Sequence, residues 1–77
     1  MSISKRHNYS AMVELRLVVG ALVLPLAQLG PSFAILKEIT ILEPTAARIE
    51  VIVDNRVSTV HNVFLPHGVT SIRFEYL

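Results

Sequence analysis

The second half of the chain alternates apolar and polar residues with a period of two, the pattern of a β-strand with one buried face. The alternation runs through Arg48–Val53 and returns near the C-terminus, where Ile72, Phe74 and Tyr76 share one side. Asp54-Asn55 follows the first run, and both residues tolerate the left-handed backbone of a tight hairpin. We therefore expect a hairpin at Asp54-Asn55 and a last strand that contributes its apolar side to the core.

The register of this hairpin has two alternatives. A two-residue loop pairs Val53 with Arg56, whereas a three-residue loop sets Val53 opposite Val57 in the return strand Val57–Leu65. After that strand, Pro66-His67-Gly68 indicates another turn, because proline fixes its φ and glycine accepts a left-handed one.

The first half gives a second hairpin and one helical turn. Residues 13–19 place valine and leucine on one side, with Glu14 and Arg16 on the other. Gly20-Ala21 suits a type II′ turn, after which Leu22–Leu24 is the return strand. Pro25–Leu29 is expected to form a short helical turn, because proline opens it and Gly30 follows it.

Short strands at Phe33–Leu36 and Ile39–Leu42 complete a set of six to seven, with turn signals about ten residues apart. This spacing predicts an all-β fold, either a small antiparallel sandwich or a partly open barrel. We expect residues 1–11 to be a flexible N-terminal arm and residues 12–77 to be a single β domain.

The composition indicates self-association. A chain of 77 residues without cysteine has no disulfide to stabilise it, yet 52% of its residues are hydrophobic and only 17% are charged. Val18, Ile52 and Val60 do not fit the inner side of their strands, so they form a possible interaction surface. The alternatives are a monomer that covers both sides of its sheet and a symmetric homodimer, the simplest assembly.

One segment also suggests secretion. Leu17–Leu29 is uncharged and follows basic residues, as in a signal peptide, but the run is too short for a membrane span. Glu14 and Arg16 instead continue a strand pattern into it. We expect a cytoplasmic protein, with a cleaved secretory signal as the alternative.

The chain resembles a set of small uncharacterised bacterial all-β proteins. The resemblance covers Leu15 to Gly68 and depends on LPLAQLGPSF, on the hairpin IEVIVDNR and on the turn FLPHG. The pattern has Asp-Gly where this sequence has Asp54-Asn55, an acceptable exchange in a tight turn. The resemblance implies a domain that recurs as a free-standing unit, and it implies no activity.

The residue pattern gives no catalytic, cofactor or metal site. His61 and His67 lie six residues apart, without the spacing of zinc ligands, and we expect one on a strand and one on a turn. No serine stands in a nucleophile elbow, and Asp54 sits at the tip of a hairpin. We predict a non-enzymatic protein that interacts with a protein partner or with itself.

The alternative function is nucleic-acid binding by a small β domain with a basic N-terminal arm. Its contacts would come from Lys5, Arg6, Arg16 and Arg73. The net charge of +1 is low for such a role, because phosphate recognition usually depends on a clustered excess of positive charge.

Overall fold

The computed structural model of the chain describes residues 12–77, and all of its regular elements there are strands. The predicted arm, residues 1–11, lies outside the described residues. The six strands are β2 (Val13–Val19), β3 (Leu22–Leu29), β4 (Phe33–Leu36), β5 (Thr45–Val53), β6 (Arg56–Leu65) and β7 (Arg73–Glu75).

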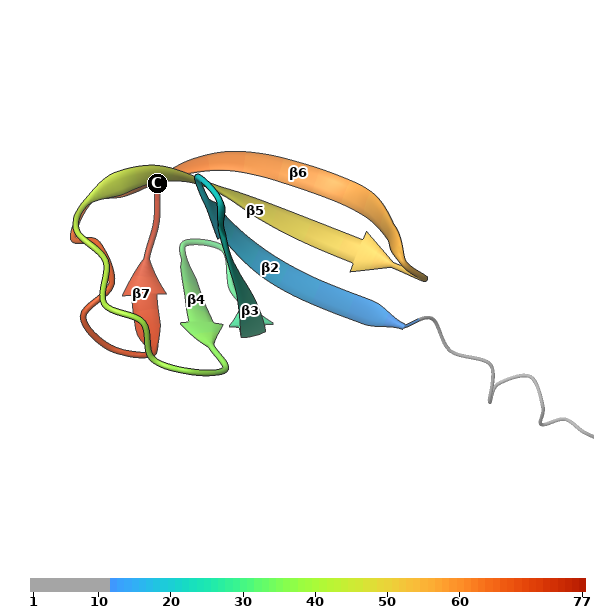
Figure 1. The fold of residues 1–77 in the computed structure, drawn as a ribbon, viewed down its shortest axis with the longest axis horizontal. Helices are drawn as coiled ribbons and strands as arrows, with labels where there is room; N and C mark the ends of the chain where they lie inside the picture. Colours follow the sequence, from blue (N-terminus) through green and yellow to red (C-terminus); the bar gives the residue numbers. More distant parts are fainter. Residues whose placement is uncertain (1–11) are drawn as a thin grey trace, which may run out of the picture.

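The strands form one antiparallel sheet in the order β6-β5-β2-β3-β4-β7. Three pairs are joined by hairpins, whereas β5 reaches β2 and β7 reaches β4 across longer connections (Figure 1). The all-β prediction is confirmed. The fold is a single open sheet, so the strands do not divide into the two sheets of a sandwich.

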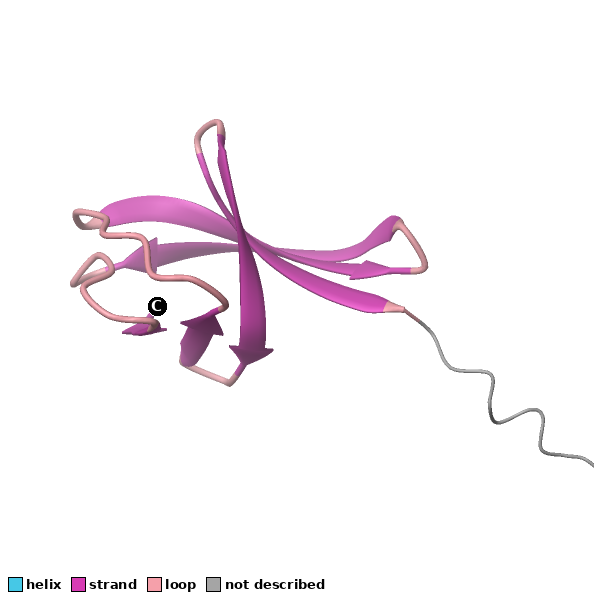
Figure 2. Ribbon diagram, turned by 60° about the horizontal axis from the view of Figure 1, so that its bottom comes forward, coloured by secondary structure: helices cyan, strands magenta, loops and turns pink. Residues whose placement is uncertain are grey.

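The sheet curls strongly, so that β6, at one end of the sheet order, comes close to the residues that follow β7, at the other end (Figures 1 and 2). The Phe64 N–H donates to the Leu77 carbonyl at 3.1 Å, and the Leu77 N–H donates to the Phe64 carbonyl at 2.9 Å. The result is the partly open form of a barrel, because the part of β6 that precedes Phe64 has no neighbour on that side among residues 12–77.

Both predicted hairpin turns form with two-residue loops. Gly20 has a φ of 60°, and Val19 pairs with Leu22 across it. Asp54 and Asn55 have φ values of 51° and 67°, as a type I′ turn requires. Val53 pairs with Arg56, so the hairpin has the two-residue loop and not the three-residue loop.

The predicted helical turn at Pro25–Leu29 is wrong, because these residues continue β3. The Pro25 carbonyl accepts a hydrogen bond of 3.1 Å from Lys37 N, so the backbone polar groups of Pro25 face away from β2. β4 begins its pairing with β3 only at Leu26, and the missing N–H of Pro25 therefore leaves no hydrogen bond of the sheet unmade. Proline is tolerated there for this reason.

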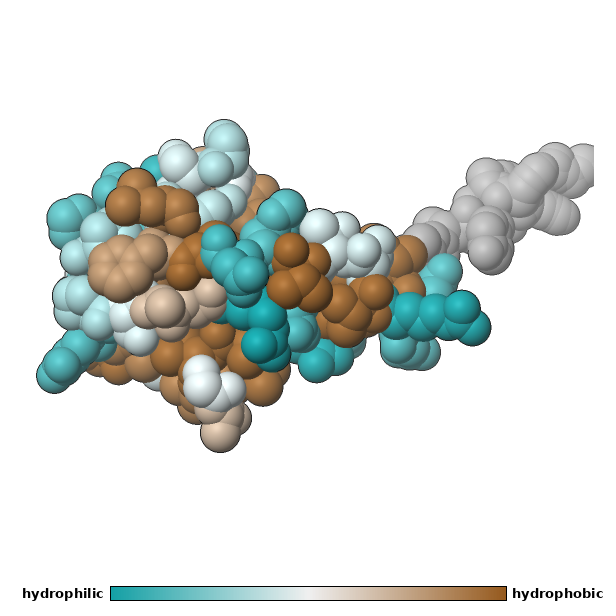
Figure 3. Space-filling model, turned by 90° about the horizontal axis from the view of Figure 1, so that it is seen from above, coloured by the Kyte–Doolittle hydropathy of each residue, from teal (hydrophilic) through white to brown (hydrophobic). Residues whose placement is uncertain are grey.

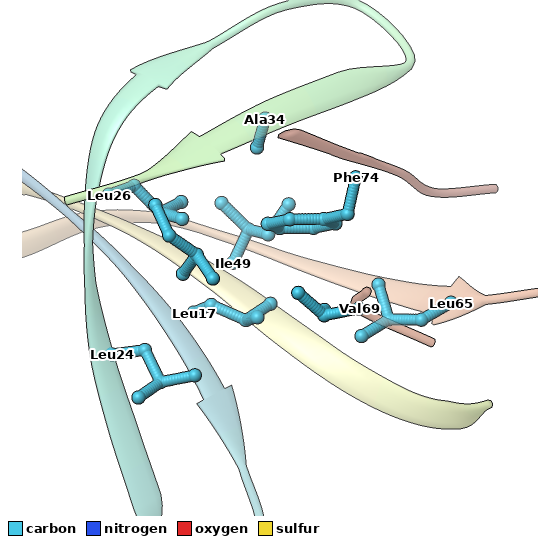
Figure 4. Close-up of a cluster of buried hydrophobic side chains, with 9 residues drawn as sticks. Leu17, Leu24, Leu26, Ala34, Ile49, Leu65, Val69 and Phe74 are labelled. Atoms are coloured by element: carbon cyan, nitrogen blue, oxygen red, sulfur yellow. The ribbon is translucent and has the colours of Figure 1, made fainter. Parts of the chain in front are cut away.

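The segment predicted as a possible signal lies at the centre of the sheet. Its leucines at positions 17, 24 and 26 are buried, and they pack with Ile49, Leu65 and Phe74 in the hydrophobic core (Figure 4). Leu17–Leu29 therefore contributes the end of β2 and all of β3 to this domain.

The prediction that the last strand turns Ile72, Phe74 and Tyr76 toward the core is confirmed only in part. Phe74 is 4% exposed and lies in the core, with Tyr76 partly buried beside it, but Ile72 is 49% exposed. β7 begins only at Arg73, so Ile72 belongs to the bend before it and does not share the alternation of the strand. The predicted strand at Ile39–Leu42 reduces to one bridge, between Leu42 and Val69.

Candidate interaction surface

The most distinctive feature of residues 12–77 is the side of β6 that faces away from β5. Because Phe64 exchanges its hydrogen bonds with Leu77, its N–H and carbonyl point away from β5. Backbone groups alternate direction along an antiparallel strand, so Asn62 and Val60 direct theirs to the same side. Within residues 12–77 no strand lies next to β6 there. These groups are available to pair with an added strand.

This open edge has a defined length. At one end Phe64 is already bonded to Leu77. At the other end the pairing with β5 shifts between Val51 and Ile52, which leaves Ser58 as an extra residue in β6. We call Thr59–Val63, the stretch between these two points, the open edge.

Natural proteins commonly protect edge strands with proline, lysine or an inward-pointing charge. β6 has none of these along the open edge, and its one arginine, Arg56, lies at the hairpin end. Residues 56–62 are all exposed. The open edge is therefore unprotected against strand addition.

The outer side of the sheet, which faces away from the core, carries both apolar and polar residues next to the open edge. Val57 and Val60 are about half exposed, and Val60 lies opposite Glu50, which accepts a hydrogen bond of 3.0 Å from Arg48 Nε. Seen from the side of β6, apolar and polar side chains alternate across the surface (Figure 3). Such a surface can bury apolar area while its polar groups keep contact with water.

Of the predicted interaction residues, only Val60 is exposed. Val60 is 47% exposed, whereas Val18 and Ile52 are 7% and 2% exposed. The prediction that these three form a surface is therefore corrected. Val18 and Ile52 do lie on the outer side of the sheet, but their strands are interior, so neighbouring side chains cover them from both sides. Val18 lies between Arg48 and Val23, and Ile52 lies between Glu14 and Val57.

The predicted nucleic-acid contacts are not gathered in the described part of the chain. Lys5 and Arg6 lie outside the described residues. Arg16 is on β2, where it forms an ion pair of 3.8 Å with Glu14, and Arg73 is on β7 with its guanidinium 4.4 Å from the Phe33 ring centre. β3 and β4 separate the two arginines, a distance of about 14 Å at the usual strand spacing.

A hollow of about 290 Å³ lies beside the open edge, where the sheet does not close. Its walls include Pro31, His61, Tyr76 and Leu77, and the Tyr76 hydroxyl donates a hydrogen bond of 2.6 Å to the Gly30 carbonyl. His61 belongs to the inner side of β6, as its parity with the buried Leu65 requires. It is exposed although its partner Ile49 is in the core, because β6 is an edge strand among residues 12–77. The sequence pattern predicts a strand at His61, which β6 confirms, but gives no signal that the residue lines a hollow.

The described residues offer no arrangement for metal chemistry. Among residues 12–77, no three His, Asp or Glu side chains gather where they could hold a metal ion. His67 lies 4.0 Å from Glu75, and both side chains are largely exposed. In the same part of the chain there is no helix of the length and hydrophobicity needed to cross a bilayer.

Comparison of the chain with models of known protein families, with curated proteins and with solved structures gives no match. The geometry of the described residues is therefore the basis for a functional hypothesis.

Proposed function

We propose that this domain is a non-enzymatic protein-interaction module that self-associates by adding a β-strand to the open edge of β6. The observation that carries the proposal is the direction of the Val60 and Asn62 backbone groups, which face outward, where no strand of residues 12–77 lies beside them. Strand addition satisfies such groups with main-chain hydrogen bonds, and the flanking side chains give specificity.

The exposed apolar residues near the open edge support the same function. Val57 and Val60 are both about half exposed, and both lie on the side of β6 that faces away from the core. Covering them stabilises an assembly in proportion to the apolar area removed from water.

A proline at position 60 tests the proposal. The Val60 N–H points away from β5, so Val60→Pro removes an outward donor and keeps the hydrogen bonds between β5 and β6. Val60→Thr is the matched control, because it keeps the N–H and the β-branched shape while reducing the apolar character. Circular dichroism and the cooperativity of thermal unfolding check that both variants fold.

The readout is the mass in solution. At about 100 μM the unchanged protein and Val60→Thr should show light-scattering masses well above the 8.6 kDa of one chain, because mass action favours association. Val60→Pro should return to the mass of one chain. A folded, unchanged protein that stays monomeric at this concentration would refute self-association.

A further inference from the structure

The open edge also determines which strand it can pair with and in which register. We infer that its partner is β6 of a second copy of this chain, joined antiparallel around a two-fold axis at His61. This inference rests on the proposed function, and it adds the register of the interface.

The register follows from counting the outward-facing groups. The open edge has five residues, Thr59–Val63, and its two outward-facing members flank the central residue, His61. With the axis at His61, Val60 faces Asn62 of the second copy, and Asn62 faces Val60 of the second copy. Each such pair exchanges two hydrogen bonds, so all outward groups of the open edge are satisfied.

The neighbouring registers are excluded by the structure. An axis at Asn62 sets Val60 opposite Phe64 of the second copy, whose backbone groups are already bonded to Leu77. An axis at Val60 sets Asn62 opposite Ser58 of the second copy, the extra residue where regular alternation breaks. Of these three, only the axis at His61 avoids both the bonded groups of Phe64 and the irregular backbone at Ser58.

The side chains are compatible with this pairing. On the inner side, Thr59 lies opposite Val63 of the second copy, a β-branched pair that packs well across strands. β6 has no acidic residue, and its single arginine, Arg56, lies near the end of the strand. The two-fold axis places the arginines of the two copies at opposite ends of the interface, so they do not repel each other.

The hollow beside the open edge gives these inner side chains a place to lie. It is lined by His61 and Val63 on β6 and by Pro31 and Tyr76 on the facing side. An added strand extends the sheet over this opening, so its inner side chains, His61 and Thr59 of the second copy, point toward the hollow. The second copy thereby covers the place where a single chain leaves its sheet open.

Single-cysteine variants test the register cleanly, because the chain has no cysteine of its own. At the axis the two copies of residue 61 form a non-hydrogen-bonded pair with Cα atoms about 4.5 Å apart, within the range of a disulfide. Val60→Cys and Asn62→Cys are the matched controls. In this register each faces the other position, so two identical cysteines lie diagonally, beyond about 7 Å.

The experiment exposes each variant at about 100 μM to a glutathione redox buffer and measures the disulfide-linked dimer on a non-reducing gel. His61→Cys should cross-link at least about tenfold faster than either control. Adding Val60→Pro to His61→Cys should remove this difference. Light scattering on the reduced variants measures association independently of the cross-link.

The outcomes separate the register from the proposed function. If the reduced proteins associate but Val60→Cys or Asn62→Cys links faster, the register is wrong and self-association stands. If they associate and none of the three links, the interface lies elsewhere and the inference is overturned. If every reduced variant and the unchanged protein stay monomeric, the proposed self-association itself fails.

Discussion

Phe64 and Leu77 exchange two backbone hydrogen bonds, of 3.1 and 2.9 Å, although Phe64 lies on β6 and Leu77 follows β7, the strand at the opposite end of the sheet order. This pair holds the curled sheet in its partly open form. It also determines the direction of the backbone groups along the open edge, because those groups alternate from Phe64 back to Thr59. The same contact that nearly closes the fold thus leaves Val60 and Asn62 facing outward.

Amide hydrogen exchange should show this alternation directly. In dilute protein the amides of Val60 and Asn62 should exchange at least about tenfold faster than those of His61 and Val63, which face β5. The Phe64 amide should be protected by Leu77. Raising the concentration should slow the exchange of Val60 and Asn62 as the open edge becomes covered. Equal protection of Val60 and His61 in dilute protein would mean that β6 has another neighbour.

The core position of Phe74 gives a stability prediction. Phe74→Ala should lower the free energy of unfolding by about 3 to 5 kcal/mol, because the side chain is 4% exposed and leaves a cavity. Ile72→Ala, two residues away and half exposed, should cost less than about 1 kcal/mol. Urea unfolding of both variants measures the difference. Similar losses would place Ile72 in the core with Phe74.

Two glycines with the same backbone conformation should respond differently to alanine. Gly20 and Gly68 have φ values of 60° and 63°, so either substitution costs about 1 to 2 kcal/mol of left-handed strain. At Gly20 the added Cβ meets no atom within 4 Å. At Gly68 it collides with the Leu42 carbonyl, next to the two hydrogen bonds that join Leu42 and Val69.

Gly68→Ala should therefore reduce the free energy of unfolding by at least about 1 kcal/mol more than Gly20→Ala does. Denaturant unfolding compares the two variants under the same conditions. Equal costs would show that the loop at Leu42 moves aside freely, and that the bridge between Leu42 and Val69 contributes little to stability.

The sequence alone determined the features that depend on local backbone chemistry. The hairpins at Gly20-Ala21 and Asp54-Asn55 follow from residues that accept a positive φ, and the strands before them follow from alternation. The strand at Phe33–Leu36 follows from a short apolar run. These signals act over a few residues, so no tertiary contact is needed to predict them.

The tertiary structure decided what depends on a strand's neighbours. Pro25 is compatible with β3 only because no hydrogen bond of the sheet requires its missing N–H, and local sequence favoured a helix there. Ile52 is buried although its outer-side parity suggested exposure, because it lies on an interior strand between β2 and β6. The candidate site has the same origin: the pairing of Phe64 with Leu77, thirteen residues apart, sets where the open edge begins. No local pattern encodes that pairing, since it exists only after the sheet has curled.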